Sequence, residues 1–194
     1  QWIRDRSSEH HLSPKRSQLL SGFNFDRNQK VLEVGCGCGA MTRFLGETFG
    51  TVVSIERSLS RARLSRLRTR DLDSVSIVCA PLPEIQFAEQ FDIIFVDDGS
   101  EVSSWFAESE DRNDRAFGHL ASILAPGGVV VIATDNQSGV RYRGSSCDGR
   151  IDRSTQDTAG QHRAHATARP AAKLQLEEEL RRHFPEVRFY YPFP

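Results

Sequence analysis

The stretch VLEVGCGCGAMTRFL, residues 31–45, decides the fold. A short apolar run leads into three alternating glycines, Gly35, Gly37 and Gly39, and a helix is expected to begin directly after them. Glycines at a strand-to-helix turn let the backbone approach a ligand closely, as they do in nucleotide-binding folds. The stretch therefore predicts a cofactor site at the end of a buried strand.

The glycine spacing alone leaves the cofactor open, because it satisfies both G-x-G-x-x-A and E-x-G-x-G-x-G. A carboxylate at Glu33 would repel a pyrophosphate, whereas it would attract a ligand that carries an ammonium and a sulfonium. Glu56 follows the next apolar run, where it suits ribose hydroxyls. The two acids favour S-adenosylmethionine over NAD(P). In the competing interpretation, Glu33 pairs with an arginine and the loop is only a turn.

Apolar runs alternate with helical patterns along the chain. The expected strands are 30–34, 51–56, 75–80, 91–98, 129–136 and 187–194, and the expected helices are 14–20, 40–47, 59–70, 113–124 and 171–184. This alternation predicts an α/β fold: a Rossmann-like, doubly wound, mostly parallel sheet flanked by helices. The stretch APGG, residues 125–128, is expected to stop the preceding helix. The final strand of such a sheet is expected to be missing.

The length of 194 residues predicts a single domain, residues 1–194. Its expected parts are an N-terminal cap segment (1–29), a cofactor-binding core (30–135), a polar loop or lid (136–170), and a C-terminal helix and strand (171–194). The loop is assigned because it has hardly any apolar periodicity, and such long loops are commonly lids or disordered.

Composition excludes several classes of protein. A net charge of −1 gives no overall attraction to nucleic acid, and no apolar run approaches the roughly 20 residues of a membrane span. The four cysteines lack the second close pair that a zinc site needs, so reduced thiols in the cytoplasm are expected. We therefore expect a cytoplasmic location and neither a nucleic-acid partner nor a membrane span.

The segment VLEVGCGCGAMTRFLGE resembles motif I of the class I S-adenosylmethionine-dependent methyltransferases. More narrowly, HHLSPKRSQLL, CGAMTRFLGE, LAPGGVVVIATDNQSGVRY and FYYPFP are similar to methyltransferase domains found beside or fused to bacterial glycosyltransferases of cell-surface polysaccharide synthesis. The resemblance implies an enzyme that O-methylates a sugar or polysaccharide precursor. It also implies a saccharide or other small-molecule acceptor, and a glycosyltransferase as partner or fused domain.

The same resemblance implies which residues bind the cofactor. They are Glu33, Gly35, Cys36, Gly37, Gly39, Glu56, Arg57, Ala80, Pro81 and Asp97. Many relatives have an acidic residue at the position of Ala80, which accepts a hydrogen bond from the adenine amino group. Alanine at this position weakens adenine selection or leaves it to a backbone group.

A hydroxyl acceptor must lose its proton to a general base or to a metal-assisted step. The candidate catalytic residues are Asp97 and His11, with His119 as a further candidate base. FDIIFVDD and the later DN resemble catechol-type, magnesium-dependent O-methyltransferases, which implies that Asp97, Asp135 and Asn136 bind Mg²⁺. Asp and Asn at strand ends also cap helices and turns, so the metal site stays open.

Two other functions remain possible at this point. One is a non-catalytic methyltransferase-like module of a larger protein, and the other is an NAD(P)-binding oxidoreductase. The arginines of SRARLSRLRTRD, residues 60–71, form a basic helix face. Such a face is typically solvated with a few acidic partners, and the alternative is a site for a phosphorylated or nucleotide-linked sugar.

Overall fold

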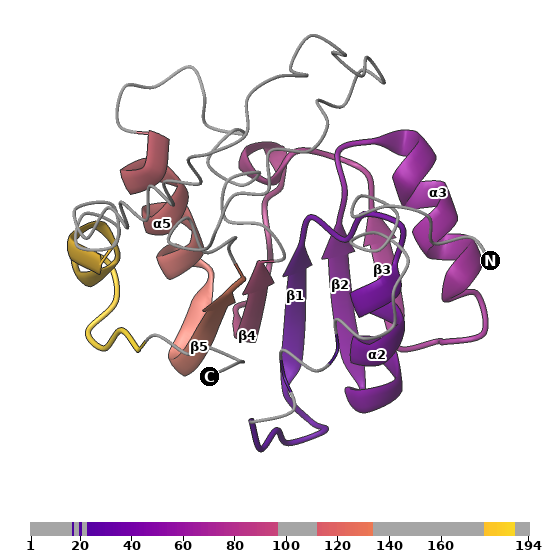
Figure 1. Ribbon diagram of the computed structural model, residues 1–194, viewed down its shortest axis with the longest axis horizontal. Helices are drawn as coiled ribbons and strands as arrows, with labels where there is room; N and C mark the ends of the chain where they lie inside the picture. Colours follow the sequence, from indigo (N-terminus) through magenta and orange to yellow (C-terminus); the bar gives the residue numbers. More distant parts are fainter. Residues whose placement is uncertain (1–16, 18–19, 21–22, 97–111, 134–176, 189–194) are drawn as a thin grey trace, which may run out of the picture.

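The computed structural model describes residues 17, 20, 23–96, 112–133 and 177–188. Within these residues, five parallel strands form one sheet in the order β3-β2-β1-β4-β5 (Figure 1). The strands are β1 (Lys30–Val34), β2 (Thr51–Ile55), β3 (Val75–Val78), β4 (Phe91–Val96) and β5 (Leu124–Ile132). The helices are α2 (Ala40–Thr48), α3 (Leu59–Arg68), the short 3-10 helix η2 (Leu82–Glu84) and α5 (Arg112–Ser122). The predicted Rossmann-like sheet is confirmed.

Alternate residues of β1 belong to two separate apolar cores. Leu32 and Val34 pack with the α5 side chains Phe117 and Leu120, whereas Val31 packs in the core that contains α2. A strand that is apolar on both sides is typical of a parallel sheet with helices on both faces. The strands β2 and β3 are added on one side of β1, and β4 and β5 on the other. The carboxyl ends of the neighbouring parallel strands β1 and β4 lie at this switch point, where such folds bind ligands.

The last strand begins earlier than the sequence predicts. Helix α5 ends at Ser122, and β5 begins at Leu124 and includes the stretch APGG. Phe91 pairs with Leu124 but Ile93 already pairs with Val129, so the stretch bulges out of the ladder. The prediction that APGG stops the helix is wrong, since the helix has already ended at Ser122 and APGG lies within β5. The sequence is ambiguous here because proline and glycine occur in strand bulges as well as at helix ends.

Several expected elements are shorter in the structure or lie outside the described residues. Helix α3 ends at Arg68, and β3 ends at Val78. Of the expected N-terminal helix, only Ser17 and Leu20 are described, and Leu20 is buried in the core with α2. The loop 136–170 lies outside the described residues, as do the expected strand ends 97–98 and 134–136.

The C-terminal helix is described over residues 177–181, and the chain then turns. His183 lies 2.9 Å from the carboxylate of Asp114, which joins this segment to α5. Val187 and Arg188, the first residues of the expected sixth strand, lie in no strand, and residues 189–194 are outside the described part. No helix among the described residues combines the length and the apolar content that crossing a membrane requires.

Candidate functional site

The glycine loop leaves the end of β1 and is attached to the end of β2. The N–H groups of Gly35 and Cys36 both donate to the carbonyl oxygen of Ile55, at 3.0 and 2.9 Å. Gly35, Gly37 and Gly39 all have positive φ, at 83°, 52° and 79°. Residues with side chains rarely adopt this conformation, so the alternating glycines are required by the backbone path of the loop.

Gly39 is also needed because the loop lies directly against α3. A Cβ on Gly39 would stand 2.7 Å from the Oγ and 2.8 Å from the Cα of Ser65. Gly39 is the N-cap of α2, and its carbonyl oxygen accepts the N–H of Arg43. The loop thus places the first turn of α2, with its partial positive charge, at the carboxyl end of β1.

Glu33 is fully buried on the face of β1 that carries Val31. Its Oε2 accepts a hydrogen bond of 2.6 Å from the hydroxyl of Ser54, which is its paired residue on β2. Sequence reasoning selected Glu33 but missed Ser54, because only the register of β1 against β2 brings them together. The loop therefore has a fixed carboxylate beneath it.

Glu56 follows β2 and links the loop to the start of α3. Its Oε2 accepts the N–H of Gly37 at 2.9 Å, and its Oε1 accepts the N–H of Ser58 at 2.8 Å. Arg61 donates to Oε1 as well, at 2.8 Å, with its own side chain about one third exposed. Sequence reasoning missed Arg61, which reaches back from the first turn of α3. The carboxylate of Glu56 is thereby oriented by three donors.

The two loop cysteines are held as thiols. Burial raises the pKa of Cys36 far above its usual range, and the nearby charge of Glu33 raises it further. Burial also raises the pKa of Cys38. A thiol that stays protonated is a poor nucleophile and a poor metal ligand. Cys36 instead fills the space beneath the loop, with its sulfur 3.5 Å from the Oγ of Ser65.

Three more of the expected cofactor residues, Arg57, Ala80 and Pro81, lie along the same edge of the sheet, and Asp97 is outside the described residues. Arg57 follows Glu56 and is exposed, so the guanidinium that contacts Glu56 belongs to Arg61. Ala80 and Pro81 are half-buried where the chain leaves β3 and enters η2. The structure thus brings the glycine loop, Glu33 and Glu56 together, and it places Ala80 and Pro81 two strands away.

The expected catalytic and metal residues His11, Asp97, Asp135 and Asn136 lie outside the described residues. His119 is described and lies on α5, where burial lowers its pKa. Over the described ranges, no group of three or more His, Cys, Asp or Glu side chains is arranged to hold a metal.

The described site fits a cofactor with a ribose and a positively charged tail. Glu56 presents hydrogen-bond acceptors beside the glycine loop, and Glu33 adds a buried carboxyl group near the end of the neighbouring strand. Ionised carboxylates beside the loop would repel the charges of a pyrophosphate.

Comparison with known proteins identifies the family. The model of the family described as "Methyltransferase domain" matches residues 32–132, which is more than half of the chain. The chain belongs to the class I S-adenosylmethionine-dependent methyltransferases. The matched residues run from β1 to the end of β5, and S-adenosylmethionine is the cofactor of the family.

Two curated relatives of this methyltransferase are O-methyltransferases by name. It is 25% identical over 120 residues to a malonyl-[acyl-carrier protein] O-methyltransferase of Priestia megaterium, covering 61% of this chain and 40% of the relative. It is 24% identical over 142 residues to a ubiquinone biosynthesis O-methyltransferase of a Bradyrhizobium species, covering 66% and 53%. The chain thus spans about half or less of the length of these relatives.

Among solved structures, the methyltransferase is similar to the N-methyltransferase NodS from Bradyrhizobium japonicum. The TM-score is 0.51 at 25% identity, over 66% of this chain and 68% of NodS. NodS has also been solved in complex with S-adenosylhomocysteine.

Proposed function

We propose that this methyltransferase transfers a methyl group from S-adenosylmethionine to a hydroxyl oxygen of a sugar or polysaccharide precursor. The observation that carries the proposal is the pair of buried carboxylates, Glu33 and Glu56, at the ends of adjacent strands around the glycine loop. The names of the two curated relatives support oxygen as the acceptor atom. The saccharide class rests on the resemblance of the terminal segments to glycosyltransferase-associated methyltransferases.

Glu56 would bind the ribose hydroxyls of the cofactor. An ionised carboxylate has about four acceptor positions, and Gly37, Ser58 and Arg61 occupy three of them. Two ribose hydroxyls therefore require that one existing donor move away. Arg61 is the donor that can leave, because the other two are backbone N–H groups and its side chain is partly exposed.

Glu33 would act through its charge. Its carboxylate is fully buried, so its field is screened less by water than that of a surface acid. It would favour the ammonium and sulfonium groups of the cofactor at the end of β1. When bound, S-adenosylmethionine supplies a methyl group already activated on sulfur.

The protein would then chiefly align the acceptor oxygen with the methyl group. Alignment alone corresponds to effective concentrations of about 10⁵ M or more. His11 and Asp97 are the proposed groups for removing the hydroxyl proton, and Mg²⁺ held by Asp97, Asp135 and Asn136 is the proposed alternative.

Calorimetric titration tests the cofactor assignment. The protein should bind S-adenosylhomocysteine and not NAD⁺, and Glu56→Gln should weaken that binding roughly tenfold or more, because a charged acceptor is lost. Glu89→Gln is the matched control, since Glu89 is an exposed acid at a distance from the loop. Tighter binding of NAD⁺ than of S-adenosylhomocysteine would overturn the assignment.

Transfer of a labelled methyl group tests the acceptor. Nucleotide sugars, malonyl-carrier protein and a catechol are offered separately, each with added Mg²⁺ or with EDTA. We expect label on the sugar acceptor. Label on the carrier-bound carboxyl or on the catechol instead would reject the saccharide class. Cofactor binding without transfer to any acceptor would favour the non-catalytic module.

A further inference from the structure

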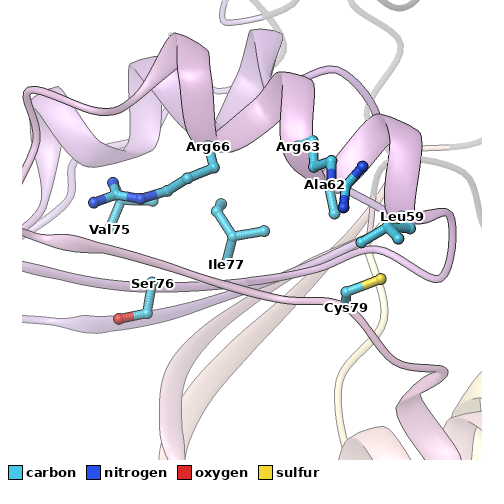
Figure 2. Close-up of a pocket in the computed structure, with 8 residues that line it drawn as sticks. All are labelled: Leu59, Ala62, Arg63, Arg66, Val75, Ser76, Ile77 and Cys79. Atoms are coloured by element: carbon cyan, nitrogen blue, oxygen red, sulfur yellow. The ribbon is translucent and has the colours of Figure 1, made fainter.

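A hollow of about 460 Å³ lies between α3 and the edge strand β3, separate from the glycine loop. Figure 2 shows Arg63 and Arg66 reaching from α3 over the side of β3 that carries Val75 and Ile77. Leu59 and Cys79 stand together at one end. The hollow thus combines an apolar floor with two guanidinium groups at its rim.

The strand that borders the hollow has an open edge. Among the described strands, β3 is the outermost and pairs only with β2. The carbonyl oxygens of Ser74 and Val78 accept the N–H groups of Val52 and Glu56. Because a strand directs the backbone groups of alternate residues to opposite edges, the N–H and C=O of Ile77 face away from β2. An added strand could bond there.

Both charged side chains that line the hollow are arginines, Arg63 and Arg66. Residues 57–70 contain six arginines and no acidic residue, although the whole chain has a net charge of −1. In the part of the chain that the structure describes, neither Arg63 nor Arg66 forms an ion pair with a carboxylate. Arg66 donates to the carbonyl of Thr69 at 3.3 Å, and a guanidinium has five N–H groups in all. The rim can therefore take acidic side chains.

The same helix exposes leucines to solvent. Leu59, Leu64 and Leu67 are 54%, 51% and 63% exposed, and they are three of the four large apolar side chains that are exposed among the described residues. Of these leucines, Leu59 lines the hollow, together with Val75 and Ile77. Apolar side chains in a binding surface mark protein contacts more often than nucleic-acid contacts, because phosphates would leave them in water. The occupant is thus expected to have apolar groups as well as acids.

We propose that the hollow between α3 and β3 binds an extended acidic segment of a partner protein. The segment adds to the sheet beside β3, which is a common mode of peptide recognition. On the face turned towards α3, carboxylates contact Arg63 and Arg66, and an apolar side chain on the same face covers Leu59 and Ile77. The residues between these point to the opposite face of the sheet. The site is independent of methyl transfer and of the acceptor.

The test uses a fluorescent peptide of the repeat Glu-Thr-Val-Thr, which carries glutamate and valine on one face when extended. Binding to the full chain is followed by anisotropy. We expect saturable binding that weakens as salt rises, and no binding of the peptide with lysine in place of glutamate. Arg63→Glu with Arg66→Glu should weaken binding at least about tenfold. The control Arg27→Glu with Arg115→Glu changes the net charge equally at exposed arginines outside the hollow and should bind like the unmodified protein.

Two further peptides separate strand addition from simple charge attraction. Each is N-methylated at alternate residues, one at the glutamates and valines and the other at the threonines, so each lacks the N–H donors of one edge. An added strand bonds to β3 through one edge only, so only one of the two methylated peptides should lose binding. When the peptide that still binds is present, the amide of Ile77 should exchange more slowly with solvent. Equal binding of both peptides, or no binding of the unmethylated peptide, would overturn the proposal.

A single-stranded RNA provides the last arm of the test. Tighter binding of RNA than of the acidic peptide, with the same loss in the Arg63 and Arg66 variant, would assign the arginines to nucleic acid and reject the protein partner. Each double variant should bind S-adenosylhomocysteine normally, which shows that it is folded.

Discussion

At the scale of single residues, the loop depends on glycines for two different reasons, and Gly39 combines them. It has a φ of 79°, and a Cβ there would meet the backbone as well as the side chain of Ser65. Gly39→Ala should therefore lower the free energy of unfolding by at least about 2 kcal/mol, from strain in the left-handed region and from overpacking. Chemical denaturation measures the loss.

Gly50→Ala is the matched control for that substitution. A Cβ on Gly50 would meet only the carbonyl oxygen of Arg27, at an ordinary 3.5 Å. Its effect should stay within about 1 kcal/mol. Unfolding of the two variants at the same denaturant concentration would contradict the close packing of Gly39 against Ser65 of α3.

At the scale of elements, two neighbouring glycines near the start of β5 are required for different reasons, one for its backbone conformation and the other for close packing. Gly127 has a φ of 77° but open space around its Cβ position, whereas a Cβ on Gly128 would lie 2.9 Å from the carbonyl oxygens of Asp92 and Ala125. Gly128→Ala should thus destabilise the protein by about 2 kcal/mol and Gly127→Ala by about 1 kcal/mol. Thermal unfolding should rank them in that order, and the reverse order would contradict the bulge.

The same element shows where sequence reasoning stops. The bounds of β1 and the glycine loop were predictable because an apolar run and alternating glycines are local features. The bulge of residues 125–128 was not, because proline and glycine end helices and also interrupt ladders. The contacts of Ser54, Arg61 and Ser65 were missed for a related reason: they depend on strand register and on how α3 is rotated against the loop.

At the scale of the whole molecule, the burial of His119 on α5 makes the free energy of unfolding depend on pH. His119 lies on α5, between residues that pack on the sheet, and burial lowers its pKa below the ordinary value near 6.5. As pH falls through that ordinary value, the unfolded chain takes up a proton that folded His119 does not. Stability should therefore decrease with falling pH until the folded pKa is passed, where the loss is complete.

His119→Gln should remove this component. We expect its free energy of unfolding to fall less than that of the unmodified protein between about pH 7.5 and about pH 5.5, as measured by urea denaturation across the series. Above about pH 8 the imidazole is neutral in both folded and unfolded chains, so the difference between the two proteins should be constant there. Parallel curves over the whole series would mean that α5 does not shield His119 from water when the sheet is intact.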